Sequence, residues 1–132
     1  MKKVIDTNVL INYPEIILTH DCIIPSIVIL ELESIKISGI KSEDVKLKAR
    51  NAIRILDEHF DRYEIFVITN DVYDIVALDF QMPITNDNLI IASAYKINRD
   101  RVNVEVITND LVARQVCKIF NLNVSGYENN QN

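Results

Sequence analysis

Short runs of β-branched residues alternate with longer segments of helical character along this chain, and this alternation limits the possible folds more than any other feature. Five runs predict strands, at residues 2–5, 21–25, 64–69, 104–108 and 122–124. Helices are predicted between them, at residues 26–36, 86–97 and 110–120 and over a longer segment that follows Ser42. Strands that alternate with helices are typical of a parallel sheet covered on both faces, so we expect an α/β fold.

The segment after Ser42 has the clearest helical pattern. The Ser42 side chain is a suitable N-cap. Apolar residues then recur at steps of three and four, at Val45, Ala49, Ala52, Leu56 and Phe60. Basic residues form the adjacent stripe, at Lys46, Arg50 and Arg54. Taken alone, such a stripe is a solvated helix face.

The length of 132 residues corresponds to one domain, which we expect to span residues 1–127. Residues 128–132 have the sequence ENNQN, typical of a flexible polar tail or the start of a linker. No apolar stretch approaches the roughly 18 residues of a membrane span, and no signal peptide is evident, so we expect a cytoplasmic protein without membrane contact. Cys22 and Cys117 lie inside apolar segments and are expected to be buried thiols.

The overall charge argues at first against a nucleic-acid partner. The chain has 19 acidic and 14 basic residues, a net charge of −5 and a pI of about 5.0. However, residues 36–54 contain six basic and two acidic residues. The acidic excess must therefore lie elsewhere in the chain.

Four carboxylates stand at positions where they could converge. Asp6 and Asp110 follow predicted strands, and ligands of open parallel sheets bind beyond the carboxyl ends of the strands. Asp87 lies at the start of a predicted helix, and Glu31 lies in an apolar setting where a solitary charge is costly. Each Asp, taken alone, is also explained as a helix cap. The helical pattern does not separate Glu31 from Glu33.

Four segments together resemble a known family. These segments are VIDTNVLI at 4–11, the pattern I-P-x-x-V-x-x-x-L at 24–32, NDNLIIASA at 86–94 and VITND at 106–110. In this order and spacing they resemble the four acidic motifs of PIN domains, and the resemblance covers essentially the whole chain.

The resemblance implies a fold and a set of site residues. It implies a three-layer α/β/α fold whose parallel sheet has the strand order 3-2-1-4-5. The implied catalytic and metal-site acids are Asp6, Glu31, Asp87 and Asp110, with Asn8 and Thr108 as supporting polar residues. The family's glutamate directly precedes a leucine, which selects Glu31 over Glu33.

VITND occurs twice, at 67–71 and 106–110. In the implied strand order only the second copy faces the crevice. Asp71 is then expected to be a helix cap.

The acid set predicts its own chemistry. Four carboxylates in one cleft raise one another's pKa unless cations are bound. All-oxygen ligands favour Mg²⁺ or Mn²⁺, and one or two such ions could promote phosphodiester hydrolysis. The resemblance implies a ribonuclease acting on single-stranded RNA that leaves 5′-phosphate and 3′-hydroxyl ends. The stripe of Lys46, Arg50 and Arg54 would then contact RNA phosphates.

Several alternatives stay open. LELESIK, KARNAIRILDE and VARQVCKIFNLNVSGY resemble the N-terminal PIN domain of PhoH-like ATPases, although no GxxxxGK[ST] loop is present. The chain would then be an excised domain or a free-standing relative, with such an ATPase as a fused or separate partner. A toxin-type PIN endoribonuclease held by an antitoxin is a second reading, and a non-catalytic module that binds RNA or protein is a third. A homo-oligomer is compatible with all three.

Overall fold

A parallel five-stranded sheet forms the centre of the protein. The computed structural model describes residues 1–128. The strands are β1 (Lys2–Ile5), β2 (Cys22–Pro25), β3 (Tyr63–Phe66), β4 (Val104–Ile107) and β5 (Asn123–Ser125). Their order is β3-β2-β1-β4-β5, and every neighbouring pair is parallel. The predicted α/β class and strand order are confirmed. Except for Glu128, the predicted tail lies outside the described residues.

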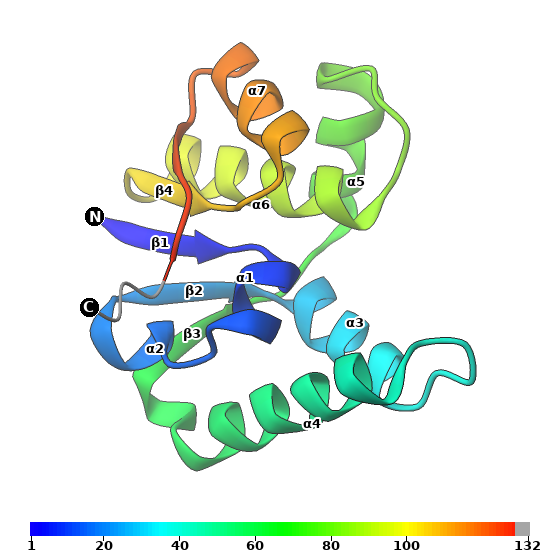
Figure 1. The fold of residues 1–132 in the computed structure, drawn as a ribbon. Coiled ribbons are helices and arrows are strands. Elements are labelled where there is room, and N and C mark those ends of the chain that lie inside the picture. The colour runs from blue at the N-terminus through cyan, green and yellow to red at the C-terminus, as the bar shows by residue number, and fades with distance from the viewer. Residues whose placement is uncertain (129–132) are drawn as a thin grey trace.

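Helices cover both faces of this sheet. They are α1 (Thr7–Asn12), α2 (Ile16–Thr19), α3 (Ser26–Lys36), α4 (Glu43–Glu58), α5 (Asn70–Asp74), α6 (Asn86–Asp100) and α7 (Leu111–Ile119). Two shorter turns are a 3-10 helix, η1 (Phe60–Arg62), and a π-helix, η2 (Ile75–Asp79). Figure 1 shows α1 to α4 on one side of the sheet and α5 to α7 on the other. This arrangement is the expected three-layer α/β/α architecture.

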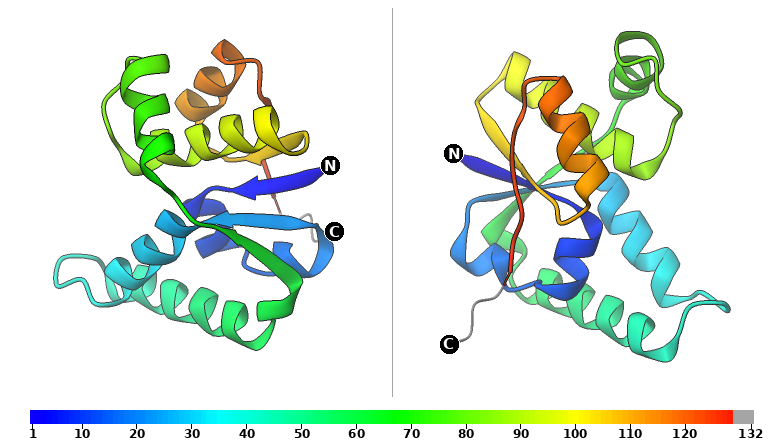
Figure 2. Two further views of the ribbon diagram at one scale, coloured as in Figure 1. Left: turned by 180° about the vertical axis from the view of Figure 1, so that it is seen from behind. Right: turned by 45° about the horizontal axis from the view of Figure 1, so that its top comes forward.

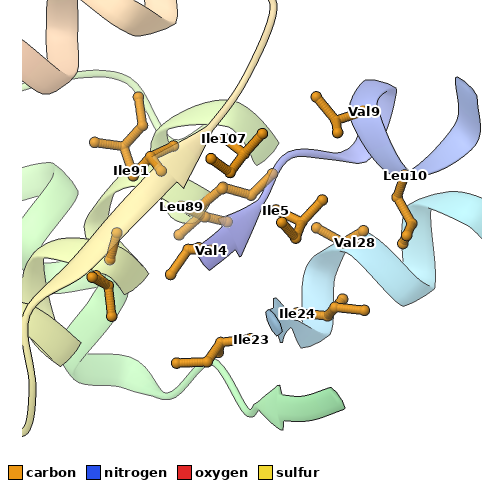
Figure 3. Close-up of a cluster of buried hydrophobic side chains, with 14 of the residues drawn as sticks. Val4, Ile5, Val9, Leu10, Ile23, Ile24, Val28, Leu89, Ile91 and Ile107 are labelled. Carbon is orange, nitrogen blue, oxygen red and sulfur yellow. The ribbon is translucent and has the colours of Figure 1, made fainter. Parts of the chain in front are cut away.

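Aliphatic side chains fill the space between the layers. Figure 3 shows Ile5 of β1 and Ile24 of β2 beside Val28 of α3, with Leu89 of α6 near Val4. All five are at most 2 % exposed. Full burial of such a side chain stabilises the fold by about 1.5–3 kcal/mol. The central strand β1 is therefore held firmly on both faces, which fixes the place where it ends.

Two short helices and one strand end differ from the sequence prediction. Helices α1 and α2 have six and four residues, too few to show an apolar period. The predicted strand at 64–69 ends at Phe66, because the amide of Ile68 donates to the Ser26 hydroxyl (3.0 Å) rather than to a neighbouring strand. Figure 2 shows β3 at the edge of the sheet.

Other expectations were met. Ser42 caps α4 by accepting a hydrogen bond from the amide of Val45 (3.3 Å). Cys22 and Cys117 are buried free thiols, and burial raises their pKa to about 12 and about 11. Within residues 1–128, no helix is long and apolar enough to cross a membrane.

Candidate functional site

Asp6 is the most buried of the four acids and lies at the carboxyl end of β1. Its side chain is 6 % exposed. One carboxylate oxygen accepts a hydrogen bond from the amide of Thr7 (2.8 Å), and the other accepts one from the Thr108 hydroxyl (2.7 Å). Burial raises the pKa of Asp6, and the charges of Asp87 and Glu31 raise it further, although both hydrogen bonds oppose the shift.

Asp87 is not a helix cap. Thr85 caps α6, since its hydroxyl accepts a hydrogen bond from the amide of Asn88 (3.1 Å). Asp87 is exposed overall and lies one turn into the helix. Partial burial of its carboxyl group raises its pKa, with further contributions from the charges of Asp110 and Glu31. Capping therefore leaves this carboxylate unexplained, whereas a shared acidic site accounts for it.

Glu31 and Glu33 lie in different surroundings on α3. Glu31 is half-buried and accepts a hydrogen bond from the Thr7 hydroxyl (2.5 Å). Glu33 is exposed and pairs with Lys36 (3.0 Å). The structure thus places Glu31 on the same side as Asp6 and Glu33 away from it.

Asp110 caps α7 and also borders the site. Its Oδ1 accepts a hydrogen bond from the amide of Ala113 (2.9 Å). Its own amide donates to the Thr108 hydroxyl (3.1 Å), the same hydroxyl that donates to Asp6. Thr108 is 1 % exposed, so this hydroxyl is a fixed link between two of the four acids.

Two hollows meet at Asp87. One has a volume of about 490 Å³, and its lining includes Asn8, Glu31 and Asp87. The other has a volume of about 240 Å³, and its lining includes Asp87 and Asp110. Asp87 also borders a small pocket beside Asp6 and Thr108. The four acids therefore line one continuous region at the carboxyl ends of β1 and β4.

The sequence analysis missed two residues of this region. Thr7 is buried and joins Asp6 to Glu31 through its amide and hydroxyl. Its only sequence signal was its position directly after Asp6. Lys41 lines the larger hollow and brings a positive charge to it. Lys41 belongs to the basic segment 36–54, but it lies outside the helical stripe on which the prediction was based.

The stripe on α4 lies apart from the acids. Arg50 and Arg54 line a surface depression of about 480 Å³ that shares no lining residue with the hollows around Asp87. Arg54 pairs with Glu58 (2.8 Å), and Lys46 pairs with Glu43 (3.1 Å). Of the three cations, Arg50 is the one without an ion pair among residues 1–128.

The donor chemistry of the site suits a hard divalent cation. All four acids offer oxygen, which favours Mg²⁺ or Mn²⁺ over softer metals. Their charges raise the pKa of Asp6 and Asp87, so a cation would relieve an existing repulsion. Among the residues described, however, no three His, Cys, Asp or Glu side chains are grouped closely enough to hold one ion. Binding therefore requires the carboxylates to move toward the ion.

Comparisons with known proteins agree with this geometry. A family model described as "PIN domain" matches residues 3–128. A search of curated proteins found no match. One similar solved structure is the crystal structure of VapBC2 from Rickettsia felis bound to a DNA fragment from their promoter. It has 19 % sequence identity and a TM-score of 0.60, covering 97 % of this chain and 100 % of that chain. At this identity the likeness shows the fold.

Proposed function

The chain belongs to the PIN domain family, and from this premise we propose that it is a Mg²⁺- or Mn²⁺-dependent ribonuclease that hydrolyses single-stranded RNA. The observation that carries the proposal is the setting of Asp87. Its carboxyl group caps no helix, and its raised pKa reflects partial burial and the charges of two acids from other elements, Asp110 and Glu31. Repelling carboxylates of this kind oppose folding and are expected at functional sites.

The residues would divide the work as follows. Asp6, Glu31, Asp87 and Asp110 would hold one or two ions. A bound ion supplies charge stabilisation at a phosphate oxygen and a more acidic bound water. The hydroxyls of Thr7 and Thr108 orient the carboxylates that they contact.

The path of the RNA is a further part of the proposal. Asn8 lines the larger hollow beside Glu31 and would offer an amide to the substrate. Lys41, at the same hollow, would meet a phosphate directly. Lys46, Arg50 and Arg54 would attract the strand at a greater distance from the acids. The cleavage ends expected for the family are a 5′-phosphate and a 3′-hydroxyl.

Cleavage of a generic single-stranded RNA tests the proposal. The parent protein should cleave with Mg²⁺ or Mn²⁺ and be inactive with EDTA. Asp87→Asn should lose most activity, while Asp71→Asn serves as a matched control because Asp71 is an exposed acid paired with Lys96 (3.5 Å). RNA binding without metal-dependent cleavage would instead identify a non-catalytic binding module.

A toxin-type PIN endoribonuclease is the second candidate. The observation in its favour is the similar structure of VapBC2 on DNA from their promoter. An antitoxin that binds this chain and suppresses cleavage would support this role. Kinship with the PIN domain of PhoH-like ATPases is a separate proposal, supported by the three segments quoted above. A cytoplasmic address and a homo-oligomer stay predictions.

A further inference from the structure

The loop between β4 and α7 is held from its outer side by two side chains. The Arg114 Nε donates to the carbonyl oxygen of Thr108 (2.9 Å), and its Nη2 donates to Oδ1 of Asn109 (3.3 Å). The Asn109 side chain also bonds the backbone of Tyr127 twice. Its Nδ2 donates to the Tyr127 carbonyl (2.9 Å), and its Oδ1 accepts from the Tyr127 amide (2.8 Å).

Gly126 makes room for this arrangement. A Cβ atom at this position would lie 2.0 Å from Nη2 of Arg114 and 2.8 Å from Oδ1 of Asn109. Gly126 does not have a positive φ, so its backbone conformation is open to other residues. Glycine is therefore required here for space, because the guanidinium occupies the volume of a side chain.

The segment that Asn109 holds is itself anchored. The Tyr127 ring packs edge-on against Tyr13, with ring centroids 5.5 Å apart, and against His20, with centroids 5.8 Å apart. The amide of Thr108 donates to the carbonyl of Ser125 (3.0 Å) and extends the pairing of β4 with β5. Both ends of the connection are thus fixed to the body of the protein.

We propose that Arg114 and Asn109 are positioning residues for the acidic site, with Gly126 as the space they require. Arg114 fixes the carbonyl of Thr108, whose hydroxyl holds both Asp6 and the amide of Asp110. Asn109 lies between these two site residues and ties them to Tyr127. The effect on the loop follows from the contacts alone, whereas the effect on metal binding rests on the proposed function.

Amide hydrogen exchange in EDTA tests the positioning effect without metal. Arg114→Ala and Gly126→Ala should each speed exchange of the Asp110 amide about tenfold. Amides of β2 should keep their parental rates. Gly39→Ala is the matched glycine control, because nothing lies within 4 Å of its Cβ position. Unchanged exchange at Asp110 in both loop variants would overturn the proposal.

A double-mutant cycle tests whether Gly126 acts through Arg114. With the guanidinium removed, Gly126→Ala meets mainly Oδ1 of Asn109, so its effect on Asp110 exchange should be clearly smaller than in the parent. Additive effects would show that Gly126 has a separate role. Arg114→Lys keeps the charge but cannot donate in the same two-point geometry, so it should restore exchange only in part. Full restoration by Lys would contradict positioning by geometry.

Titration with Mn²⁺ then measures the consequence for the site. The apparent Mn²⁺ affinity, followed by melting temperature, should fall about 10- to 100-fold in Arg114→Ala and Asn109→Asp. Gly39→Ala should bind Mn²⁺ like the parent. Parental Mn²⁺ affinity in variants with faster Asp110 exchange would refute the link to the site. A parent that binds no Mn²⁺ would refute the proposed function, while the exchange data would still decide whether the loop is positioned as stated.

Discussion

Replacing Asp6 with Asn should stabilise the metal-free protein. Asn keeps the size of the side chain and can still accept the hydrogen bond from the Thr7 amide. Its amide nitrogen can donate to the Thr108 hydroxyl, which must then rotate. The number of hydrogen bonds is therefore maintained, while the negative charge is removed from a side chain that is 6 % exposed.

The expected gain follows from the opposing effects at Asp6. Two hydrogen bonds favour the ionised form, but burial and the charges of Asp87 and Glu31 outweigh them and raise the pKa of Asp6. Each pKa unit between the folded and unfolded states is worth about 1.4 kcal/mol, so we expect a gain of the order of 1 kcal/mol at neutral pH. For a domain of this size that corresponds to a rise in melting temperature of about 4 °C.

The same substitution should remove most of the stabilisation that a metal gives. A ligand at one hundred times its dissociation constant stabilises the folded parent by about 2.7 kcal/mol. This corresponds to a rise of about 10 °C. Thermal melts of the parent, Asp6→Asn and the surface control Asp71→Asn, each in EDTA and in excess Mn²⁺, measure both effects. The reasoning is refuted if Asp6→Asn melts lower than the parent in EDTA and the parent does not respond to Mn²⁺.

Three further predictions concern the same surfaces. Asp110→Asn should lower RNA cleavage by at least about 100-fold if metal placement fails, whereas Asp71→Asn should leave it nearly unchanged; equal losses would contradict the assignment of the second VITND to the site. Changing Lys46, Arg50 and Arg54 to Gln should reduce the salt dependence of RNA binding by roughly 0.7 in slope per lost phosphate contact, with Arg50 expected to contribute most because it has no ion pair within the part of the chain described. The two site acids with raised pKa bind more protons in the folded than in the unfolded state, so stability in EDTA should fall as pH rises from about their ordinary value of 3.8 through the raised pKa; urea midpoints measured across this range should show no such fall once both acids are Asn.

The architecture was predictable because it depends on patterns that extend over many residues. Alternating strands and helices indicated the parallel sheet, and the family resemblance gave its strand order. The second VITND lies in β4, next to β1, and the first lies at the edge strand β3, as expected. The role predicted for Asp71 was wrong. The cap position of α5 is occupied by Thr69, and Asp71 lies in the first turn, paired with Lys96.

The detail of the site was less predictable because it depends on contacts between distant segments. Thr7 and Glu31 are 24 residues apart, and Thr108 and Asp6 are 102 apart. No local pattern indicates that hydroxyls will orient these carboxylates. Lys41 lies between helices, where no periodicity applies. Gly126 also lacks a sequence signal, since its role depends on where the Arg114 side chain lies in space.

Diffraction from crystals soaked in Mn²⁺ tests the central claim most directly. Anomalous scattering locates the ion independently of the protein chain. We predict a Mn²⁺ peak in contact with carboxylate oxygens of Asp6 and Asp87, with Glu31 and Asp110 bound to the same ion, to a second ion or to its waters. No such peak in the parent at saturating Mn²⁺, or a peak held only by other residues, would contradict the claim that these four acids form a metal centre.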